Sequence, residues 1–320
     1  MALLSRSGPA APAHDDQLSL HALEGEAHGL VDRLPDLLVE AMRVSSTIAH
    51  GIHGRRRPGP GETFWQFRQY EQTDAAQQID WRRSASSDQL YIRESEWEAA
   101  HTFWLWANTS PSMQFRSDLS QSSKRDRALV LLLAATELLV RGGERVALLG
   151  LTRPSANRHT AKRLAETIAG NTGLPQMSES LPRVERLSRY SGVVLVSDFL
   201  DPPEKIAKTL EALSANHVTG HLIQVLDPAE ETLPYDGRAE FLSPDQGQRW
   251  VADRVESLRE AYIEKFLAHR AAITEHARRI GWNFIVHHTD RPATEPLLNL
   301  IVRLQNAGHG ALGSLAGGLA

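Results

Sequence analysis

Two polar segments carry the side chains best suited to bind a hard cation. The first begins at Asn108, directly after an apolar run, and places serine hydroxyls at alternate positions, Ser110 and Ser112. The second is Asp198, which directly follows the apolar run over residues 193–197. Hydroxyl and carboxylate oxygens are the kind of ligand that Mg²⁺ prefers. Because the carboxyl ends of parallel strands share one edge of a sheet, we expect the two serines and the carboxylate to meet there.

The elements that would position these side chains alternate between strand and helix patterns after about residue 100. Predicted strands cover residues 102–107, 145–151, 193–197, 221–226 and 283–287. Several are continuous apolar runs, which is typical of strands buried on both faces. Predicted helices cover residues 124–141, 161–169, 203–215 and 253–280. This alternation predicts an α/β fold with a doubly wound, mostly parallel sheet flanked by helices.

A smaller module precedes this domain. Apolar residues at helical spacing predict a short helix that begins near Pro35. From Thr63 to Glu98, aromatic and branched residues occur in short runs with polar breaks, which predicts two or three β-strands. We therefore divide the chain into a mobile tail (1–30), a helix plus β-rich module (31–98), the α/β domain (99–306) and a flexible tail (307–320).

The composition excludes several classes of function. Lys and Arg number 35 and Asp and Glu 39, so the net charge is −4 and general attraction to nucleic acid or anionic lipid is not expected. The chain has no cysteine, which rules out disulfides, thiolate metal sites and cysteine nucleophiles. The N-terminus lacks the apolar stretch of a signal peptide, and no apolar run is long enough to span a bilayer. We expect a cytoplasmic protein without membrane insertion.

The loop after the first predicted strand resembles the metal-ion-dependent adhesion site of von Willebrand factor A (vWA) domains, whose pattern is Asp-x-Ser-x-Ser with a later Thr and a later Asp. The corresponding positions are Asn108 in place of the first Asp, Ser110, Ser112, Asp198, and Thr172 or else Thr160 for the Thr. Because one of two carboxylates is missing, a Mg²⁺ ion would be under-neutralised, and we expect weak metal binding or none. We favour a structural turn in which the serines bond to the local backbone.

The β-rich segment contains a series of short motifs in a fixed order. After a glycine-rich basic loop come Glu62 and Phe64, Arg68 and Tyr70, Asp74, Ile79-Asp80-Trp81, Ser84-Ala85, and Arg93-Glu94. This series is similar to the signature of the domain-of-unknown-function 58 (DUF58) family, with Thr73 in place of the usual Gly. The runs SKRDRA (123–128), GGERVALLG (142–150), VSDFLD (196–201) and DPAEE (227–231) also look familial. Members of that family are often encoded beside AAA+ ATPases of the MoxR type, so the resemblance implies such an ATPase as a partner and implies no known reaction.

The charged motif residues allow two interpretations. The set comprises Glu62, Arg68, Tyr70, Asp74, Asp80, Trp81, Arg82, Arg93 and Glu94. We favour paired charges that tie the β-rich module to the α/β domain, with Trp81 packed beneath them. The alternative is an exposed recognition surface for the ATPase. A catalytic pair of Asp74 and Asp80 is disfavoured, because no nucleophile, metal cluster or phosphate-binding loop accompanies them.

These observations predict a non-enzymatic interaction or adaptor protein that works with a MoxR-type ATPase in a chaperone-like or assembly system. We expect no catalytic residue, no cofactor and no small-molecule substrate. One alternative is a metal-dependent, hydrolase-like enzyme that uses Ser110, Ser112 and Asp198 with Mg²⁺. A second alternative is binding of single-stranded nucleic acid through the basic loop that contains Arg55, Arg56 and Arg57.

Overall fold

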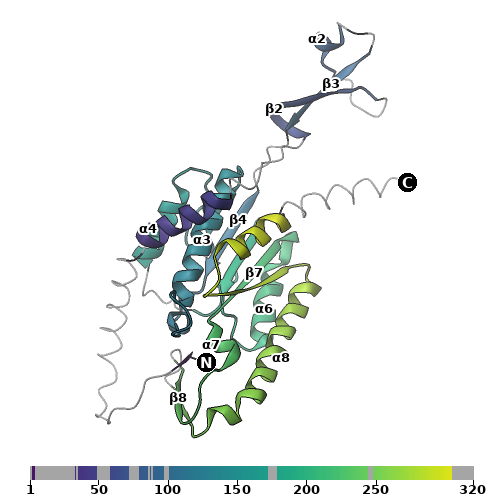
Figure 1. Ribbon diagram of the computed structural model, residues 1–320. Coiled ribbons are helices and arrows are strands. Elements are labelled where there is room, and N and C mark those ends of the chain that lie inside the picture. The colour runs from purple at the N-terminus through teal and green to yellow at the C-terminus, as the bar shows by residue number, and fades with distance from the viewer. Residues whose placement is uncertain are drawn as a thin grey trace.

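A parallel β-sheet of five strands forms the centre of the computed structural model (Figure 1). The model describes residues 2–3, 33, 35–48, 58–71, 79–85, 87, 89–96, 101–171, 179–243 and 248–304. The strand order is β10-β7-β6-β4-β5, and every neighbouring pair is parallel. The strands are β4 (Thr102–Ala107), β5 (Arg145–Leu148), β6 (Gly192–Ser197), β7 (Thr219–Leu226) and β10 (Asn283–His288). The predicted α/β fold is therefore confirmed.

Helices cover both faces of the sheet, because successive strand residues direct apolar side chains to opposite sides. The longer helices are α3 (Lys124–Arg141), α4 (Thr160–Asn171), α6 (Pro203–Leu213) and α8 (Arg259–Arg279). On one face α3 and α4 pack against residues such as Leu105 and Val194. On the other face α6 and α8 pack against residues such as Trp106 and Leu195. The core is thus split into two layers by the sheet.

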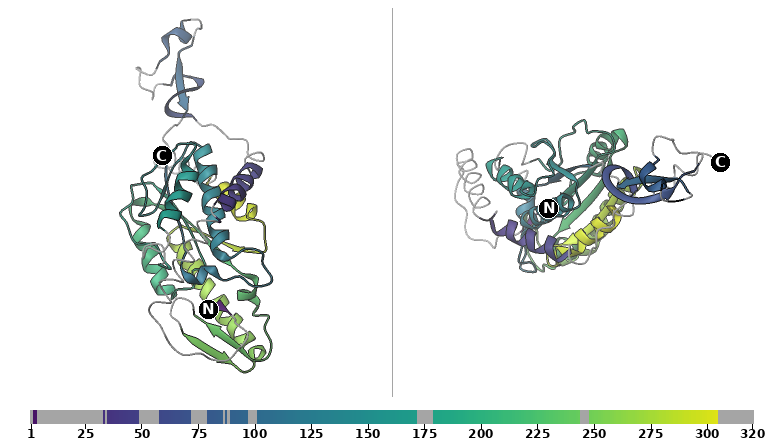
Figure 2. Two further views of the ribbon diagram at one scale, coloured as in Figure 1. Left: turned by 90° about the vertical axis from the view of Figure 1, so that its left-hand side faces the viewer. Right: turned by 90° about the horizontal axis from the view of Figure 1, so that it is seen from above.

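Two terminal helices lie together on the α3 side of the sheet (Figure 2). The helix over residues 35–48 buries Leu37, Ala41 and Ile48, in agreement with the predicted helical spacing. The helix over residues 294–304 buries Leu297 and Leu300 in the same core cluster. Within the described part of the chain, no helix is long and apolar enough to cross a membrane.

A β-hairpin that the sequence did not predict follows β7. The elements of this region are α7 (Pro228–Thr232), β8 (Ala239–Leu242), β9 (Arg249–Ala252) and the 3-10 turn η4 (Val255–Ser257). Strand β8 also pairs with β1 (Ala2–Leu3), which belongs to the segment predicted as a mobile tail. The side chains of Leu233, Phe241 and Val255 contribute to a small third core beneath the hairpin. β8 and β9 are four residues long and lie in no continuous apolar run of the kind that marks β5, so the sequence pattern did not indicate them.

The β-rich module consists of an antiparallel hairpin and one helical turn. Its elements are β2 (Pro58–Gln69), β3 (Tyr91–Glu96) and α2 (Trp81–Ser84). Within the segment predicted to contain two or three strands, Ile79 belongs to no described strand and forms a single bridge to Ile92. Asp80, the next residue, caps α2, since its side chain accepts a hydrogen bond from the Arg83 N–H.

The prediction that Trp81 packs beneath the paired charges is wrong, because 64% of its surface is exposed. Helix α2 is held instead through Ser84, which is buried. The Ser84 hydroxyl donates to the Asp80 carbonyl and accepts from the Tyr91 N–H. These two hydrogen bonds connect α2 to the residue before it and to the first residue of β3.

Candidate functional site

The candidate site lies at the carboxyl ends of β4 and β6. Asn108, directly after β4, donates from its amide to Ser197 Oγ at 3.0 Å and to Asp198 Oδ1 at 3.4 Å. Its own Oδ1 accepts the Ser110 N–H at 2.8 Å, which closes a tight turn. The hydroxyl oxygens of Ser110 and Ser112 lie 3.0 Å apart, and Ser112 donates to Asp198 Oδ2 at 3.2 Å. The structure therefore brings together the four residues that the sequence placed at this edge, and the serines bond to side chains there.

A buried lysine that the sequence interpretation missed completes the cluster. Lys124 is the first residue of α3, and its side chain is fully buried. Its Nζ donates to Asp198 Oδ2 at 2.9 Å and to Glu230 Oε1 at 2.6 Å. Side chains on a helix point toward its N-terminus, so a lysine at the first position reaches back to the loops after the strands. The helix start at Lys124 was predicted, but the burial of its side chain depends on Asp198 and Glu230, which lie 74 and 106 positions away in the sequence.

Glu230 enters the cluster from α7, which follows β7. Asp227 caps this helix: its side chain accepts the Ala229 N–H, and the Glu230 side chain accepts the Asp227 N–H in return. Glu230 thus uses Oε2 for the cap and Oε1 for Lys124. Asp227 also accepts the N–H and the hydroxyl of Ser117, at 2.9 and 2.5 Å. Hydrogen bonds and ion pairs therefore connect the segments that follow β4, β6 and β7 at this edge of the sheet.

The electrostatics of the cluster favour an ionised lysine. Burial alone would lower the pKa of Lys124, but the charges of Asp198 and Glu230 outweigh burial and hold this pKa above its ordinary value. Burial alone would raise the pKa of Asp198, but the charge and hydrogen bond of Lys124 reverse the effect and lower it. For Glu230 burial prevails, and its pKa is raised despite Lys124. Lys124 and Asp198 therefore form the charged centre of the cluster.

These contacts do not fit a divalent cation at the vWA-type position. A Mg²⁺ ion needs several oxygen ligands in near-octahedral geometry. Here Asp198 Oδ2 already accepts Lys124 and Ser112, while Asp198 Oδ1 faces the Asn108 amide. The ammonium group would also repel a second cation placed beside the same carboxylate. Over the ranges that the structure describes, no group of three or more His, Asp and Glu side chains is arranged to hold a metal ion.

The threonine of the vWA-type pattern has no described counterpart in the cluster. Thr172 lies outside the described residues. Thr160 is buried at the start of α4, where its hydroxyl donates to the Asn157 carbonyl at 2.5 Å and lies 3.2 Å from Ser155 Oγ. These bonds belong to the turn that precedes α4.

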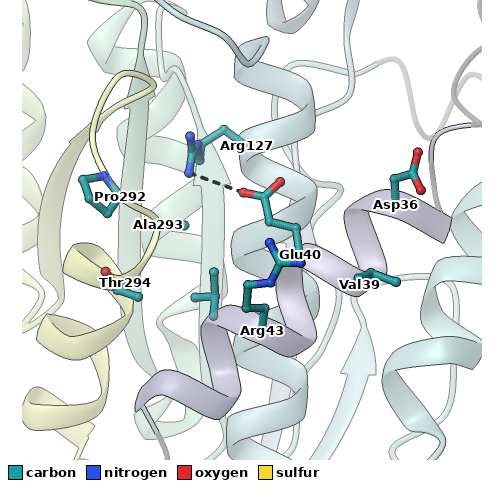
Figure 3. A pocket seen from close by; sticks show the side chains of 9 residues that line it. Asp36, Val39, Glu40, Arg43, Arg127, Pro292, Ala293 and Thr294 are labelled. Carbon is teal, nitrogen blue, oxygen red and sulfur yellow. Dashed lines mark ion pairs between the residues drawn. The ribbon is translucent and has the colours of Figure 1, made fainter.

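A separate pocket of about 560 Å³ lies between the helix over residues 35–48, α3 and residues 292–294 (Figure 3). Within it Arg127 Nη1 lies 3.8 Å from Glu40 Oε1, and Arg127 Nη2 donates to the Thr289 carbonyl at 3.0 Å. Arg43 and Asp36 add one charge of each sign to the lining. The pocket contains none of the cluster side chains, and its charges are balanced.

The structure describes some of the motif residues that were predicted to bind a partner or to join the two domains. Arg68 makes local contacts, donating to the Gln69 carbonyl at 3.0 Å and lying 3.8 Å from Glu71 Oε1. Tyr70 pairs through its backbone with Leu90. Arg82 is exposed. The structure does not describe Asp74, the side chains of Glu62, Arg93 and Glu94, or the loop of Arg55, Arg56 and Arg57.

Several mycobacterial proteins are similar to this chain in sequence. The uncharacterized protein Rv1480 of Mycobacterium tuberculosis is 28% identical over 280 residues, which cover 82% of this chain and 86% of the relative. The uncharacterized protein Mb1516 of Mycobacterium bovis matches with the same figures. An uncharacterized protein of Mycobacterium avium, MAV169, is 28% identical over 142 residues, which cover 42% of this chain and 83% of that protein.

Two solved structures are distantly similar. The conserved hypothetical protein BatB of Bacteroides thetaiotaomicron aligns with a TM-score of 0.37 and 12% identity, covering 65% of this chain and 100% of that one. An aerotolerance-related membrane protein of Bacteroides fragilis aligns with a TM-score of 0.36 and 16% identity, covering 62% and 96%. Likenesses of this size do not establish a shared fold.

The family assignment rests on a longer match. The family model described as "Protein of unknown function DUF58" matches residues 66–272, which is well over half of the 320-residue chain. The match runs from the end of β2 into α8 and includes Lys124, Asp198 and Glu230. This chain belongs to the DUF58 family.

Proposed function

We propose that the protein is a non-enzymatic interaction protein that binds a MoxR-type AAA+ ATPase through the module of β2, β3 and α2. The observation that carries this proposal is the exposure of Trp81. Among the described large hydrophobic side chains it has the largest exposed fraction, 64%. Tryptophan and arginine are enriched where binding energy concentrates in protein interfaces, and Arg82 and Arg83 follow Trp81 directly.

Other exposed side chains of the same module add to the surface that Trp81 offers. Phe67 and Leu90 are 39% and 41% exposed. The Arg83 guanidinium lies 5.7 Å from the centre of the Phe67 ring and 5.5 Å from that of Tyr91, within range of a cation–π contact. The result is an aromatic surface bordered by positive charge. Such a surface suits a partner that offers an apolar groove with an acidic rim.

The cluster in the α/β domain supports a role without catalysis. Ser112 donates to Asp198, and its hydroxyl also lies beside that of Ser110, so neither serine faces a free base. Asp198 is engaged by Lys124 and is not available to accept a proton from a substrate. A nucleophile needs an adjacent base that can take its proton. The cluster is better suited to fixing loops than to activating a hydroxyl.

The test is association with the MoxR-type ATPase encoded nearest to this gene, measured without nucleotide, with ADP and with a non-hydrolysable ATP analogue. Trp81→Ala is the informative variant, and Trp250→Ala is its control. Trp250 is 48% exposed and lies in β9. Strand β8, with which β9 pairs, lies far from α2 (Figure 1).

We expect the wild type and Trp250→Ala to bind equally well in at least one nucleotide state. Trp81→Ala should bind about 10-fold more weakly or worse, which is the usual loss at an energetically dominant interface residue. Absence of association in every nucleotide state would contradict the choice of partner. Equal binding by both tryptophan variants would contradict the choice of surface.

A further inference from the structure

We propose that Lys124 is a built-in cation that takes the place of a divalent metal at the sheet edge, and that removal of its side chain converts the cluster into a metal site. The lysine is fully buried, and two carboxylates, one after β6 and one from α7, contact its single Nζ. The Asp198 oxygen that it contacts also accepts the Ser112 hydroxyl. The ammonium thus lies among the hard oxygen atoms that would otherwise surround a metal ion.

The charges of the cluster support this assignment. A vWA-type site with two carboxylates is neutralised by a divalent ion. In this chain Asn108 replaces one carboxylate, and the cation beside Asp198 carries one charge instead of two. The first change removes one negative charge and the second removes one positive charge, so the balance between Asp198 and the cation beside it is kept. Glu230 brings a second carboxylate to the same ammonium. Either change alone would leave a buried charge uncompensated, which is strongly unfavourable.

Removal of the lysine side chain would leave Asp198 Oδ2 and Glu230 Oε1 around a buried space. Both oxygens lie within 3 Å of the present Nζ position, at 2.9 and 2.6 Å. Two buried carboxyl groups without a counter-charge can release their protons to a divalent cation that binds between them. Mn²⁺ is a suitable probe, since it prefers the same oxygen ligands as Mg²⁺.

The experiment compares the wild type, Lys124→Ala and the control Lys205→Ala by Mn²⁺ titration and by thermal unfolding in 1 mM Mn²⁺ or EDTA. Lys205 forms an ion pair with Asp201 at 2.6 Å shortly after β6, but it is largely exposed. We expect no Mn²⁺ binding and no change in Tm for the wild type and for Lys205→Ala. Lys124→Ala should bind one Mn²⁺ per chain and gain roughly 5–10 °C in Tm, as expected for a ligand at about 100 times its Kd.

Each result of these measurements either supports or overturns the proposal. Saturable Mn²⁺ binding by the wild type overturns the proposal, and so does a folded Lys124→Ala that responds to Mn²⁺ no more than the control. If Lys124→Ala is unfolded in EDTA, its refolding is compared with and without Mn²⁺. Recovery only with Mn²⁺ supports the proposal, and no recovery in either condition overturns it. The double variant Lys124→Ala/Asp198→Asn should bind Mn²⁺ at least 10-fold more weakly than Lys124→Ala, and equal affinity overturns the assignment of Asp198.

Discussion

Lys124 Nζ lies 2.9 Å from Asp198 Oδ2, although the two residues are 74 positions apart in the sequence. This pair joins the N-terminus of α3 to the loop after β6, and Glu230 extends it to α7 after β7. Because the groups are buried, each depends on the others for its counter-charge and hydrogen bonds. The edge of the sheet is therefore a connected unit, and single substitutions within it should have large effects.

Asn108→Asp should destabilise the protein by roughly 3 kcal/mol, because it places a second buried carboxylate beside Asp198 with no added cation. The Asn108 amide lies 3.4 Å from Asp198 Oδ1. Urea unfolding measures the change. The matched control is Asn157→Asp, since Asn157 also accepts a backbone N–H, that of His159, but is exposed and should tolerate the change. Full recovery of stability on addition of Mg²⁺ would contradict the role assigned to Lys124.

Asp227→Ala should cost about 1–2 kcal/mol through loss of the α7 cap, and more through loss of the contacts to Ser117. Asp227 accepts bonds from Ala229, and from both the backbone and the hydroxyl of Ser117. Hydrogen exchange should show faster exchange at the Ser117 amide and in α7. Asp236→Ala, at an exposed aspartate paired with Arg259, is the control and should change stability little. An unchanged exchange rate at the Ser117 amide would contradict the stabilisation of this segment by Asp227.

Stability should fall as the pH decreases from about 7 to 4.5, because of two buried histidines. Burial lowers the pKa of His221 to about 4 and that of His287 to about 3. Both folded-state values lie below the ordinary value of about 6.5, so in this window the unfolded chain binds protons that the native state does not. Each histidine should contribute up to roughly 1.4 kcal/mol per pH unit.

Unfolding free energies measured across that pH range test this dependence. Replacing His287 with leucine should reduce the slope by about half, since one of two titrating groups is removed. His159→Leu is the control, because His159 is exposed and should leave the slope unchanged. A slope that is the same in all three proteins would mean that other groups produce the pH dependence.

Gly220→Ala should destabilise the protein by about 1–3 kcal/mol through overpacking. A Cβ atom at this position in β7 would lie 1.9 Å from the Trp282 ring, so the indole must move. Gly170→Ala is a matched control, because its added Cβ meets nothing within 4 Å and alanine is the better helix former in α4. In thermal unfolding, the Tm of Gly220→Ala should lie several degrees below that of Gly170→Ala. Equal Tm values would show that Trp282 can shift without cost.

The sheet could be predicted from the sequence because its strands are continuous apolar runs separated by amphipathic helices. The run from Val193 to Val196 is fully apolar and becomes the buried strand β6. The meeting of Ser112 with Asp198 follows from the rule that parallel strands end at one edge. Four-residue strands such as β8 and β9 have no comparable pattern, and they were missed.

Lys124 and Trp81 could not be predicted, because their environments contradict the usual behaviour of their residue types. A lysine at the start of a helix is normally solvated, and its burial here depends on Glu230, which lies 106 positions away. A tryptophan among aromatic residues normally joins a core, but Trp81 is exposed and the buried side chain of α2 is Ser84. In both cases the outcome depends on tertiary contacts that local sequence patterns do not contain.

The most direct test of the central claim is a double-mutant cycle on Lys124 and Asp198, measured by urea unfolding. Lys124→Met alone should cost roughly 3–5 kcal/mol, because it leaves Asp198 buried without its counter-charge. The double variant Lys124→Met/Asp198→Asn should be more stable than the sum of the two single losses predicts, with a coupling energy of about 2 kcal/mol or more. Losses that simply add would show that the lysine and the aspartate do not depend on each other, and would contradict the account of a built-in cation.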